Sequence, residues 1–164
     1  TIYKIICYIE LIEKHKTCDY TFPYIGNDIL NNMMYTDINL GLFIIPIRFN
    51  NLSEYPTKYL LFCSEAEKHG YNEFYVGEHL TDKQEDIKSS ILFCSAMSAL
   101  LNKGTVAPCV LPLPYYKDKR LLVMQLIELA RMNEGRIKVG VGPGAIDDDM
   151  RLLNLDTVLP SLLN

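Results

Sequence analysis

The sequence predicts an α/β fold in which a parallel sheet is built from repeated strand–helix units. Strand-like runs begin near Leu40, Asn72, Thr105 and Ile137, at intervals of about 32 residues. A helical pattern follows each of the first three, and parallel neighbours need crossovers of this kind. Among the 164 residues, 49% are hydrophobic and 22% are charged, which is enough for one domain with a core. Spacing alone leaves open a doubly wound sheet or a barrel.

Composition excludes several classes of partner. A net charge of -4 and a pI near 5.4 argue against a surface for nucleic acid or anionic membranes. No apolar run reaches the ~18 residues of a membrane span, and no secretory signal is recognisable. We therefore expect a cytoplasmic protein whose partner is a small molecule. The odd number of cysteines and the lack of a CxxC pair predict reduced thiols and no metal site. The cysteines are Cys7, Cys18, Cys63, Cys94 and Cys109.

The first part of the chain does not fit the rhythm of the rest. Residues 1–16 are predicted to form an apolar helix, because four isoleucines recur on one helical face. They are Ile2, Ile5, Ile6 and Ile9. Two methionines, Met33 and Met34, stand directly before the first regular strand. We therefore expect residues 1–38 to be an extension and residues 39–164 to form the domain.

The first two strand–helix units have clear patterns. Residues 40–47 are a continuous apolar run, typical of a parallel strand covered on both faces, and Pro46 should end it. The helix that follows is predicted from an apolar stripe and should end at His69 and Gly70, with His69 as a C-terminal cation. That stripe is Tyr59, Phe62, Cys63 and Ala66. The second strand, residues 72–77, runs directly into Glu78 and His79.

The later units are read in the same way. A helix after the second strand is predicted to bury Phe93, Ala96, Met97, Leu100 and Leu101. The third strand should span residues 105–111. The next helix should then bury Val123, Leu126, Ile127 and Ala130, and a fourth strand should span residues 137–141.

The fourth predicted strand opens into Gly142, Pro143 and Gly144, where glycines permit close approach of a flat ligand or a phosphate. The motif fits a dinucleotide fingerprint poorly, because the third glycine comes one residue early. Residues 147–149 are three aspartates without the alternating ligands of a calcium loop. We interpret them as the acidic first turn of a helix.

Five segments in this order resemble the luciferase-like flavin-dependent monooxygenase family between about residues 40 and 156. They are LGLFIIP (40–46), YNEFYVGEHLTD (71–82), EDIKSS (85–90), VLP (110–112) and EGRIKVGVGPG (134–144). The resemblance implies a (β/α)₈ TIM-type barrel, here only its N-terminal half with about four βα units. A whole barrel needs roughly 200 residues or more.

The resemblance also implies the chemistry and the site. His79 matches the family histidine beside the flavin, and it would act as a base or hydrogen-bond donor, with Glu78 as its orienting partner. The flavin would lie against Pro46, Ala107, Pro108 and the Gly142–Pro143–Gly144 turn. The implied reaction is monooxygenation of a small organic substrate with reduced FMN and O₂, the FMN being supplied by a flavin reductase.

Two alternatives stay open beside this reading. A deazaflavin could serve the same scaffold, or the chain could be a non-catalytic flavin-binding or assembly fragment that needs homo- or hetero-oligomeric partners. Because late barrel strands supply much of the flavin phosphate site in the family, this segment alone should bind flavin weakly or not at all.

The chain also departs from the family pattern. Residues 115–117 are Tyr-Tyr-Lys and residues 129–131 are Leu-Ala-Arg, where relatives often have other motifs. Relatives have a non-proline cis peptide at the position of the Ala107–Pro108 bond, which predicts a cis bond here before proline.

Overall fold

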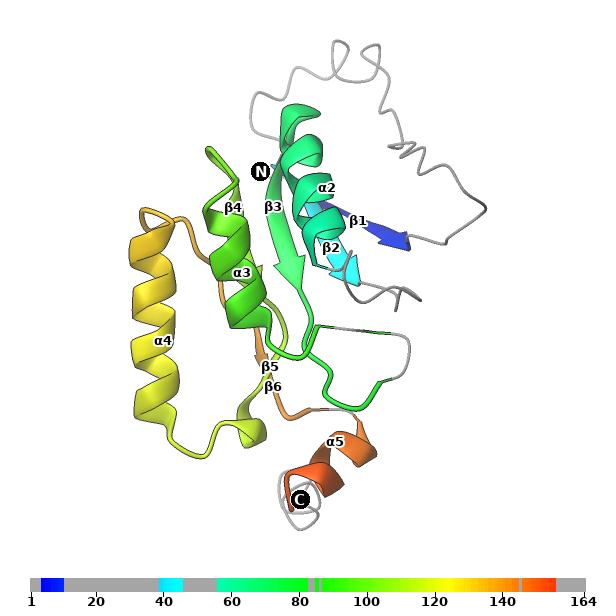
Figure 1. Cartoon of the computed structure of the whole chain (residues 1–164), viewed down its shortest axis with the longest axis vertical. Helices are drawn as coiled ribbons and strands as arrows, with labels where there is room; N and C mark the ends of the chain where they lie inside the picture. The colour runs from blue at the N-terminus through cyan, green and yellow to red at the C-terminus, as the bar shows by residue number, and fades with distance from the viewer. Residues whose placement is uncertain are drawn as a thin grey trace.

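The computed structural model describes the backbone of residues 4–10, together with residues 39–45, 56–82, 85, 87–144 and 146–155. Its main feature is a four-stranded parallel sheet in the order β1-β2-β3-β4 (Figure 1). The strands are β1 (Lys4–Glu10), β2 (Asn39–Ile45), β3 (Tyr71–Val76) and β4 (Thr105–Pro108). A two-stranded parallel sheet pairs β5 (Leu111–Pro112) with β6 (Val141–Gly142). The prediction of parallel strands in sequence order is confirmed.

The prediction of a helix over residues 1–16 is wrong, because Lys4–Glu10 forms β1. This strand pairs in parallel with β2, from Lys4 opposite Asn39 to Glu10 opposite Ile45. Residues 5–9 are a continuous run of β-branched, thiol and aromatic residues, and such a short run suits a strand as well as a helical face. β1 is thus one more parallel strand, which precedes the four that the spacing predicted. The domain boundary at residue 38 stays a prediction.

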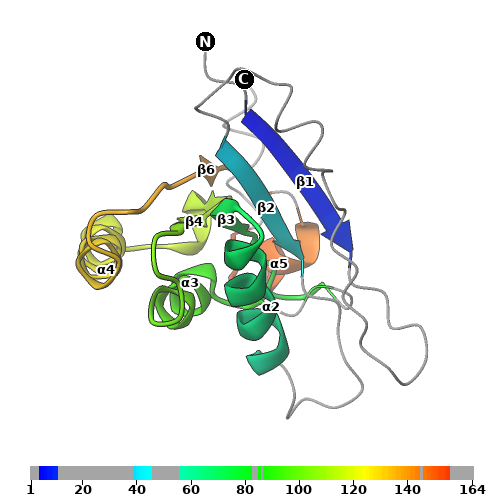
Figure 2. The same ribbon diagram turned by 90° about the horizontal axis from the view of Figure 1, so that it is seen from above.

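Helices cover one face of the four-stranded sheet. α2 (Thr57–Lys68), α3 (Ser90–Ser98) and α4 (Lys119–Met132) lie on the same side of it (Figure 2). The core forms between α2, α3 and alternate residues of the strands, because successive strand side chains point to opposite faces. From the strands it takes Leu40, Leu42, Ile44, Tyr71, Phe74, Val76 and Val106. The predicted stripe of α2 is confirmed, and all four of its residues are buried.

The predicted inward faces of the later helices are wrong in part. In α3, Phe93 and Met97 are buried as expected, but Ala96 is exposed. In α4 the buried residues are Leu122 and Leu129. Apolar residues surround most of α4, so the sequence offers several competing stripes and does not identify the one that packs. The predicted Val123 and Ile127 are 52% and 39% exposed.

The third and fourth strands are shorter than predicted. β4 ends at Pro108, and β5 follows after a cis peptide bond between Cys109 and Val110. The prediction of a cis Ala107–Pro108 bond is wrong, since Pro108 continues β4 in register with Val76. In place of a continuous fourth strand, Ile137 forms a single parallel bridge with Val106, and β6 follows.

The thiols of the core are free and buried, as expected for Cys63 and Cys94. Burial raises the pKa of both well above the ordinary thiol value. Within the described residues, no helix is long and apolar enough to cross a membrane.

Candidate functional site

Glu78 follows β3 at its carboxyl end and is almost fully buried. Its carboxylate accepts hydrogen bonds from the backbone N–H and hydroxyl of Ser90, both at 2.9 Å, and from the Tyr116 hydroxyl at 2.7 Å. Glu78 therefore joins the end of β3 to the start of α3 and to the segment after the 3₁₀ turn Leu113–Tyr115. In this structure the partners of Glu78 are Ser90 and Tyr116, and the orienting role predicted for it toward His79 stays a prediction.

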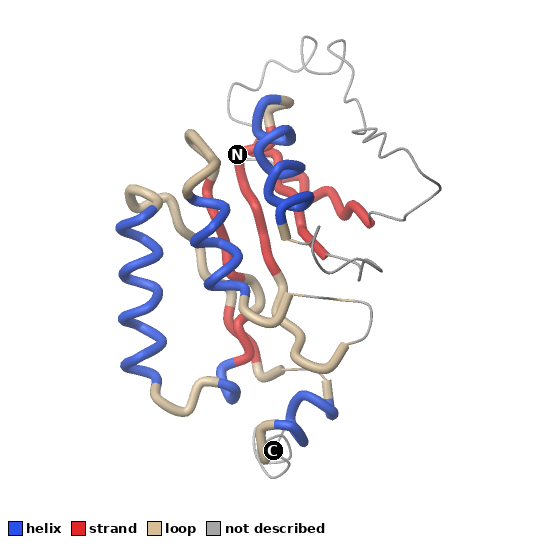
Figure 3. The backbone as a smooth tube through the Cα atoms, in the orientation of Figure 1, coloured by secondary structure: helices blue, strands red, loops and turns tan. Residues whose placement is uncertain are grey.

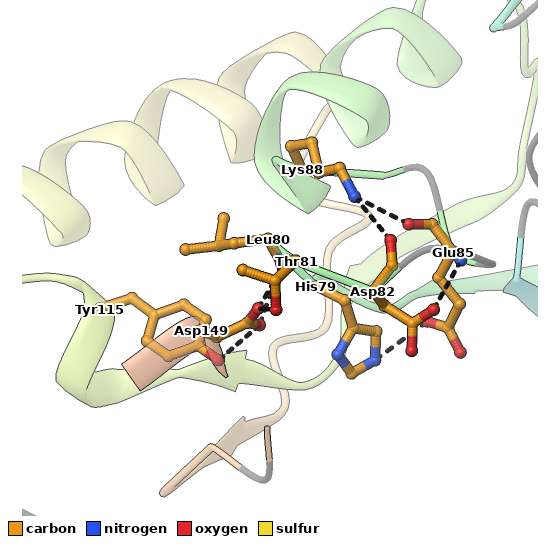
Figure 4. A network of polar contacts seen from close by, with 8 residues as sticks. All are labelled: His79, Leu80, Thr81, Asp82, Glu85, Lys88, Tyr115 and Asp149. Atoms are coloured by element: carbon orange, nitrogen blue, oxygen red, sulfur yellow. Dashed lines mark hydrogen bonds and ion pairs between the residues drawn. The ribbon is translucent and has the colours of Figure 1, made fainter. Parts of the chain in front are cut away.

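His79 pairs instead with Glu85. Its Nε2 lies 3.0 Å from a Glu85 carboxylate oxygen, and Figure 4 shows the other ring nitrogen turned away from that contact. The hydrogen bond that His79 donates to Glu85 and the negative charges of Glu85, Asp149 and Asp82 raise the pKa of His79 above its ordinary value, although partial burial opposes this. Within the described part of the chain, Glu85 is thus the partner of the His79 ring, through Nε2 and not through Nδ1.

Asp149 clamps the loop that carries His79. It belongs to α5 (Asp147–Leu152) and is fully buried. It accepts the N–H of Leu80 at 3.0 Å, the N–H of Thr81 at 2.6 Å and the Tyr115 hydroxyl at 2.8 Å. In Figure 3 the loop that leaves β3 runs down to α5. Burial alone would raise the pKa of Asp149, but these hydrogen bonds, with a further one from the Thr81 hydroxyl, hold it below its ordinary value.

This clamp is not apparent from the sequence. Asp147 and Asp148 are exposed first-turn acids, as expected, but Asp149 has a different role. Its partners Leu80, Thr81 and Tyr115 are 69, 68 and 34 residues away, so no local pattern marks it. The described residues contain no group of three or more side chains that could hold a metal ion.

His79 opens onto a cavity of about 490 Å³ at this end of the sheet. Five predicted site residues line it: Glu78, His79, Gly142, Pro143 and Gly144. Ala107 and Pro108 do not, because both are buried within β4. Pro46 lies outside the described residues.

Most of the remaining wall was not predicted, and it is apolar. It consists of Phe43, Gly77, Val110, Pro112, Tyr115 and Val141. Phe43 was detectable in principle, because it alternates with the core residues Leu42 and Ile44 and must face away from the helices. The others come from the short β5–β6 pair and the 3₁₀ turn, whose meeting the sequence does not reveal.

Two glycines of the cavity wall allow close packing. A Cβ added to Gly142 would lie 2.7 Å from Val110 Cγ1, and one added to Gly144 would lie 2.3 Å from Met150 Cε. Gly144 also has a φ of +85°, which favours glycine. A larger residue at Gly142 would require Val110 to move, and one at Gly144 would require Met150 to move and the strained positive φ to be kept.

The two tyrosines at the site act as donors and not as acids. The pKa values of Tyr115 and Tyr116 are raised well above the ordinary phenol value, mainly by burial and next by the adjacent carboxylate. Both phenols therefore stay protonated and hold Asp149 and Glu78. Among the described residues that line this cavity, His79 carries an imidazole, a group that can donate or accept a proton near neutral pH.

The chain is similar in sequence to several monooxygenases. It is 30% identical over 89 residues to limonene 1,2-monooxygenase of Rhodococcus erythropolis, covering 54% of this chain and 23% of that protein. It is 28% identical over 123 residues to 4-hydroxyprotoasukamycin monooxygenase of Streptomyces nodosus subsp. asukaensis, covering 73% and 32%. For 2,5-diketocamphane 1,2-monooxygenase 1 of Pseudomonas putida the identity is 32% over 98 residues, covering 60% and 26%. The chain thus spans about a third or less of the length of these relatives.

Solved structures agree on the fold. The oxygenating constituent of 3,6-diketocamphane monooxygenase from Pseudomonas putida, a type II Baeyer–Villiger monooxygenase in complex with FMN, matches with a TM-score of 0.68 at 20% identity. That match covers 73% of this chain and 33% of the other. The monooxygenase RslO1 from Streptomyces bottropensis matches with a TM-score of 0.66 at 16% identity, covering 73% and 37%. No family model matches the sequence. The homologues of this chain are therefore monooxygenases of the luciferase-like type, which it resembles over part of their length.

Proposed function

We propose that this chain is part of a flavin-dependent monooxygenase that uses reduced FMN and O₂ on a small organic substrate. The observation that carries the proposal is the histidine at the carboxyl end of β3, which lines a largely apolar cavity and pairs through Nε2 with Glu85, in a chain whose homologues are monooxygenases. We further propose that the βα units of this chain belong to a (β/α)₈ barrel. In such barrels the active site lies at the carboxyl ends of the strands, where His79 is found.

The cavity fits a flat, largely apolar cofactor ring. Its volume of about 490 Å³ lies within the usual range of ligand sites. Phe43, Val110 and Val141 supply apolar contacts, and the Gly142–Gly144 turn brings backbone to the wall without side chains. Bound FMN would supply the oxygen chemistry. The described residues that line the cavity include no lysine or arginine for its phosphate, so we expect other parts of the full-length protein to hold that group.

In this proposal His79 holds and moves a proton at Nδ1 beside the reacting atoms. An imidazole near its pKa is suited to this, since it can serve as donor or acceptor close to neutral pH. The apolar side chains exclude water, which strengthens hydrogen bonds made inside the cavity. A flavin reductase in the same cytoplasmic compartment would supply the reduced FMN.

The test uses the full-length protein that carries these residues. We expect it to bind FMN, measured by quenching of flavin fluorescence, and to consume O₂ when a reductase, NADH and a substrate are supplied. Limonene and 2,5-diketocamphane, which appear in the names of relatives, are the first substrates to try. His79→Ala should slow turnover by a factor on the order of 10²–10⁴. Its effect on FMN binding should be smaller.

His69→Ala is the matched control, because His69 caps α2 and does not line the cavity. Wild-type turnover in His79→Ala would remove the proposed catalytic role. Binding of a deazaflavin in place of FMN would indicate that the site catalyses hydride transfer and not monooxygenation. A protein that binds no flavin at all would instead be a non-catalytic assembly partner, to be tested by its oligomeric state.

A further inference from the structure

The contact between His79 and Glu85 is built into a closed loop. Glu85 lies six residues after His79, and both side chains are largely shielded, with 24% and 31% exposure. The Glu85 backbone N–H donates to an Asp82 carboxylate oxygen at 3.2 Å. The Lys88 ammonium donates to the carbonyl oxygens of Glu85 at 2.9 Å and of Asp82 at 3.2 Å (Figure 4). Both backbone polar groups of Glu85 are therefore fixed, which places its carboxylate beside His79.

We propose that Glu85 is the positioning residue of this site, and that its carboxylate holds the His79 proton on Nε2 so that Nδ1 serves the cavity. This role rests on the proposed function. A carboxylate accepts but does not donate a hydrogen bond, so it selects the tautomer with hydrogen on Nε2. The neutral ring then presents a lone pair at Nδ1, and the protonated ring presents an N–H there. A partner of this kind also fixes the orientation of the ring.

The charges around His79 support Glu85 as the dominant partner. The titratable groups near the ring are Glu85 and Asp82 in its own loop, Glu78 beside it, Asp149 of α5 and Tyr115 of the 3₁₀ turn. Asp149 and Glu78 are engaged by other donors, and Tyr115 stays protonated. The nearby cation, Lys88, binds backbone carbonyls. Glu85 contacts the ring directly, and it is the first cause of the raised pKa of His79.

Nitrogen NMR of the histidine rings tests the proposal on the 164-residue chain itself, with no flavin present. Above the titration of His79, long-range ¹⁵N correlations should show hydrogen on Nε2. In Glu85→Gln we expect the titration midpoint of His79 to move to lower pH, because the neutral amide no longer favours the imidazolium. The tautomer preference should also weaken. Glu85→Asp keeps the charge and should move the midpoint back toward the wild-type value.

The chain offers a matched control in Glu65→Gln, since Glu65 lies 3.5 Å from a different histidine, His69. That variant should leave the His79 midpoint unchanged. Hydrogen on Nδ1 in the unmodified chain, or an unmoved midpoint in Glu85→Gln, would overturn the proposal. The first of these readouts needs no variant, so it decides the matter even where Glu85→Gln does not fold.

The outcome is separable from that of the proposed function. If the His79 midpoint shifts as expected but the full-length protein binds no flavin, the function fails and the role of Glu85 stands. If the full-length protein turns over substrate but the midpoint does not shift, the function stands and Glu85 has no positioning role. Where both hold, Glu85→Gln should also move the pH profile of kcat to lower pH, which a purely structural role would not do.

Discussion

The two ends of the sheet use the same device for different purposes. At the amino end of β4, the Glu67 carboxylate accepts the backbone N–H groups of Asn102, Lys103 and Gly104 at 2.9, 2.8 and 2.6 Å. The buried Asn133 amide closes the same end by donating to the carbonyl oxygens of Gly104 and Arg136. At the carboxyl end of β3, Asp149 accepts the N–H groups of two successive loop residues in the same way.

The difference lies in what each carboxylate holds in place. Glu67 closes a turn of ordinary residues and does not line the cavity onto which His79 opens. Asp149 closes a loop that presents His79 to a cavity. Fixing a loop is therefore a general means of stabilising this fold, and at one end it also holds a reactive group in position. In barrel enzymes this division between a stabilising and a reactive end is the rule.

The largest expected effect is that of Asp149→Ala. Removing a fully buried carboxylate leaves the Leu80, Thr81 and Tyr115 donors without their partner, and we expect a loss of about 3 kcal/mol in the free energy of unfolding. Urea denaturation measures it. Asp148→Ala is the control, since Asp148 is exposed and pairs only with Arg151. A loss for Asp149→Ala as small as that for Asp148→Ala would show that the clamp is not needed.

Glu67→Ala should cost somewhat less, about 2 kcal/mol, because Glu67 is only partly buried and water can replace it for some donors. This variant also tests whether the two ends of the sheet are independent, through the NMR signals of the His79 ring. The ring signals of His79 should stay unchanged in Glu67→Ala but shift in Asp149→Ala. If both variants moved these signals equally, the two ends would not be separate.

Tyr116→Phe should lower the free energy of unfolding by about 1 kcal/mol, the usual value of one hydrogen bond. Glu78 keeps its two bonds from Ser90, so the loss is limited. Thermal unfolding followed by circular dichroism measures it, with the exposed neighbour in Lys117→Ala as the reference. A loss as large as that in Asp149→Ala would make Tyr116, and not Asp149, the main support of the site.

The smallest effect should be on the pH dependence of stability. The lowered pKa values of Asp149 and Glu67 contribute stability above about pH 4. This contribution is lost as the pH falls through the pKa values of the folded state, so both ends of the sheet lose stability in acid. The raised pKa of His79 contributes stability below about pH 6.5, and this is lost as pH rises through the folded value. His79→Gln should remove only this second decline in urea titrations at several pH values. If stability still declined in the same way above about pH 6.5 in His79→Gln, the decline would belong to another titratable group.

The parts of the fold that could be predicted are those with local signals. The α2 stripe and the β3 run have one dominant periodicity each, and the structure has both within a residue or two of the expected bounds. β1 was missed because its apolar run satisfies two periodicities at once. The buried face of α4 was missed because Leu121, Leu122, Val123 and Met124 are consecutive apolar residues. Leu122 is the one that packs, in a cluster with Ile91 of α3 and Leu111 of β5, which are distant in the sequence.

The site divides in the same manner. His79 and the Gly142–Gly144 turn lie at strand ends, where alternation and glycine pattern mark them. Glu85 and Asp149 gave no such signal, since the first is one of several acids in a polar loop and the second is one of three consecutive aspartates. Their roles depend on side-chain direction and on contacts between distant segments, which a single sequence does not encode in any short window.

The distance along the chain between Thr81 and Asp149 bears on how the site comes into being during synthesis. The two residues are 68 positions apart, and ribosomes add about 5–20 residues per second. The loop with His79 therefore leaves the ribosome several seconds before its clamp does. For that interval the nascent chain can pair β2 with β3 but lacks the acceptor for the Leu80 and Thr81 N–H groups. The reactive end of the sheet is thus completed after the supporting end, whose clamp residue Glu67 is made before its partners Asn102 to Gly104.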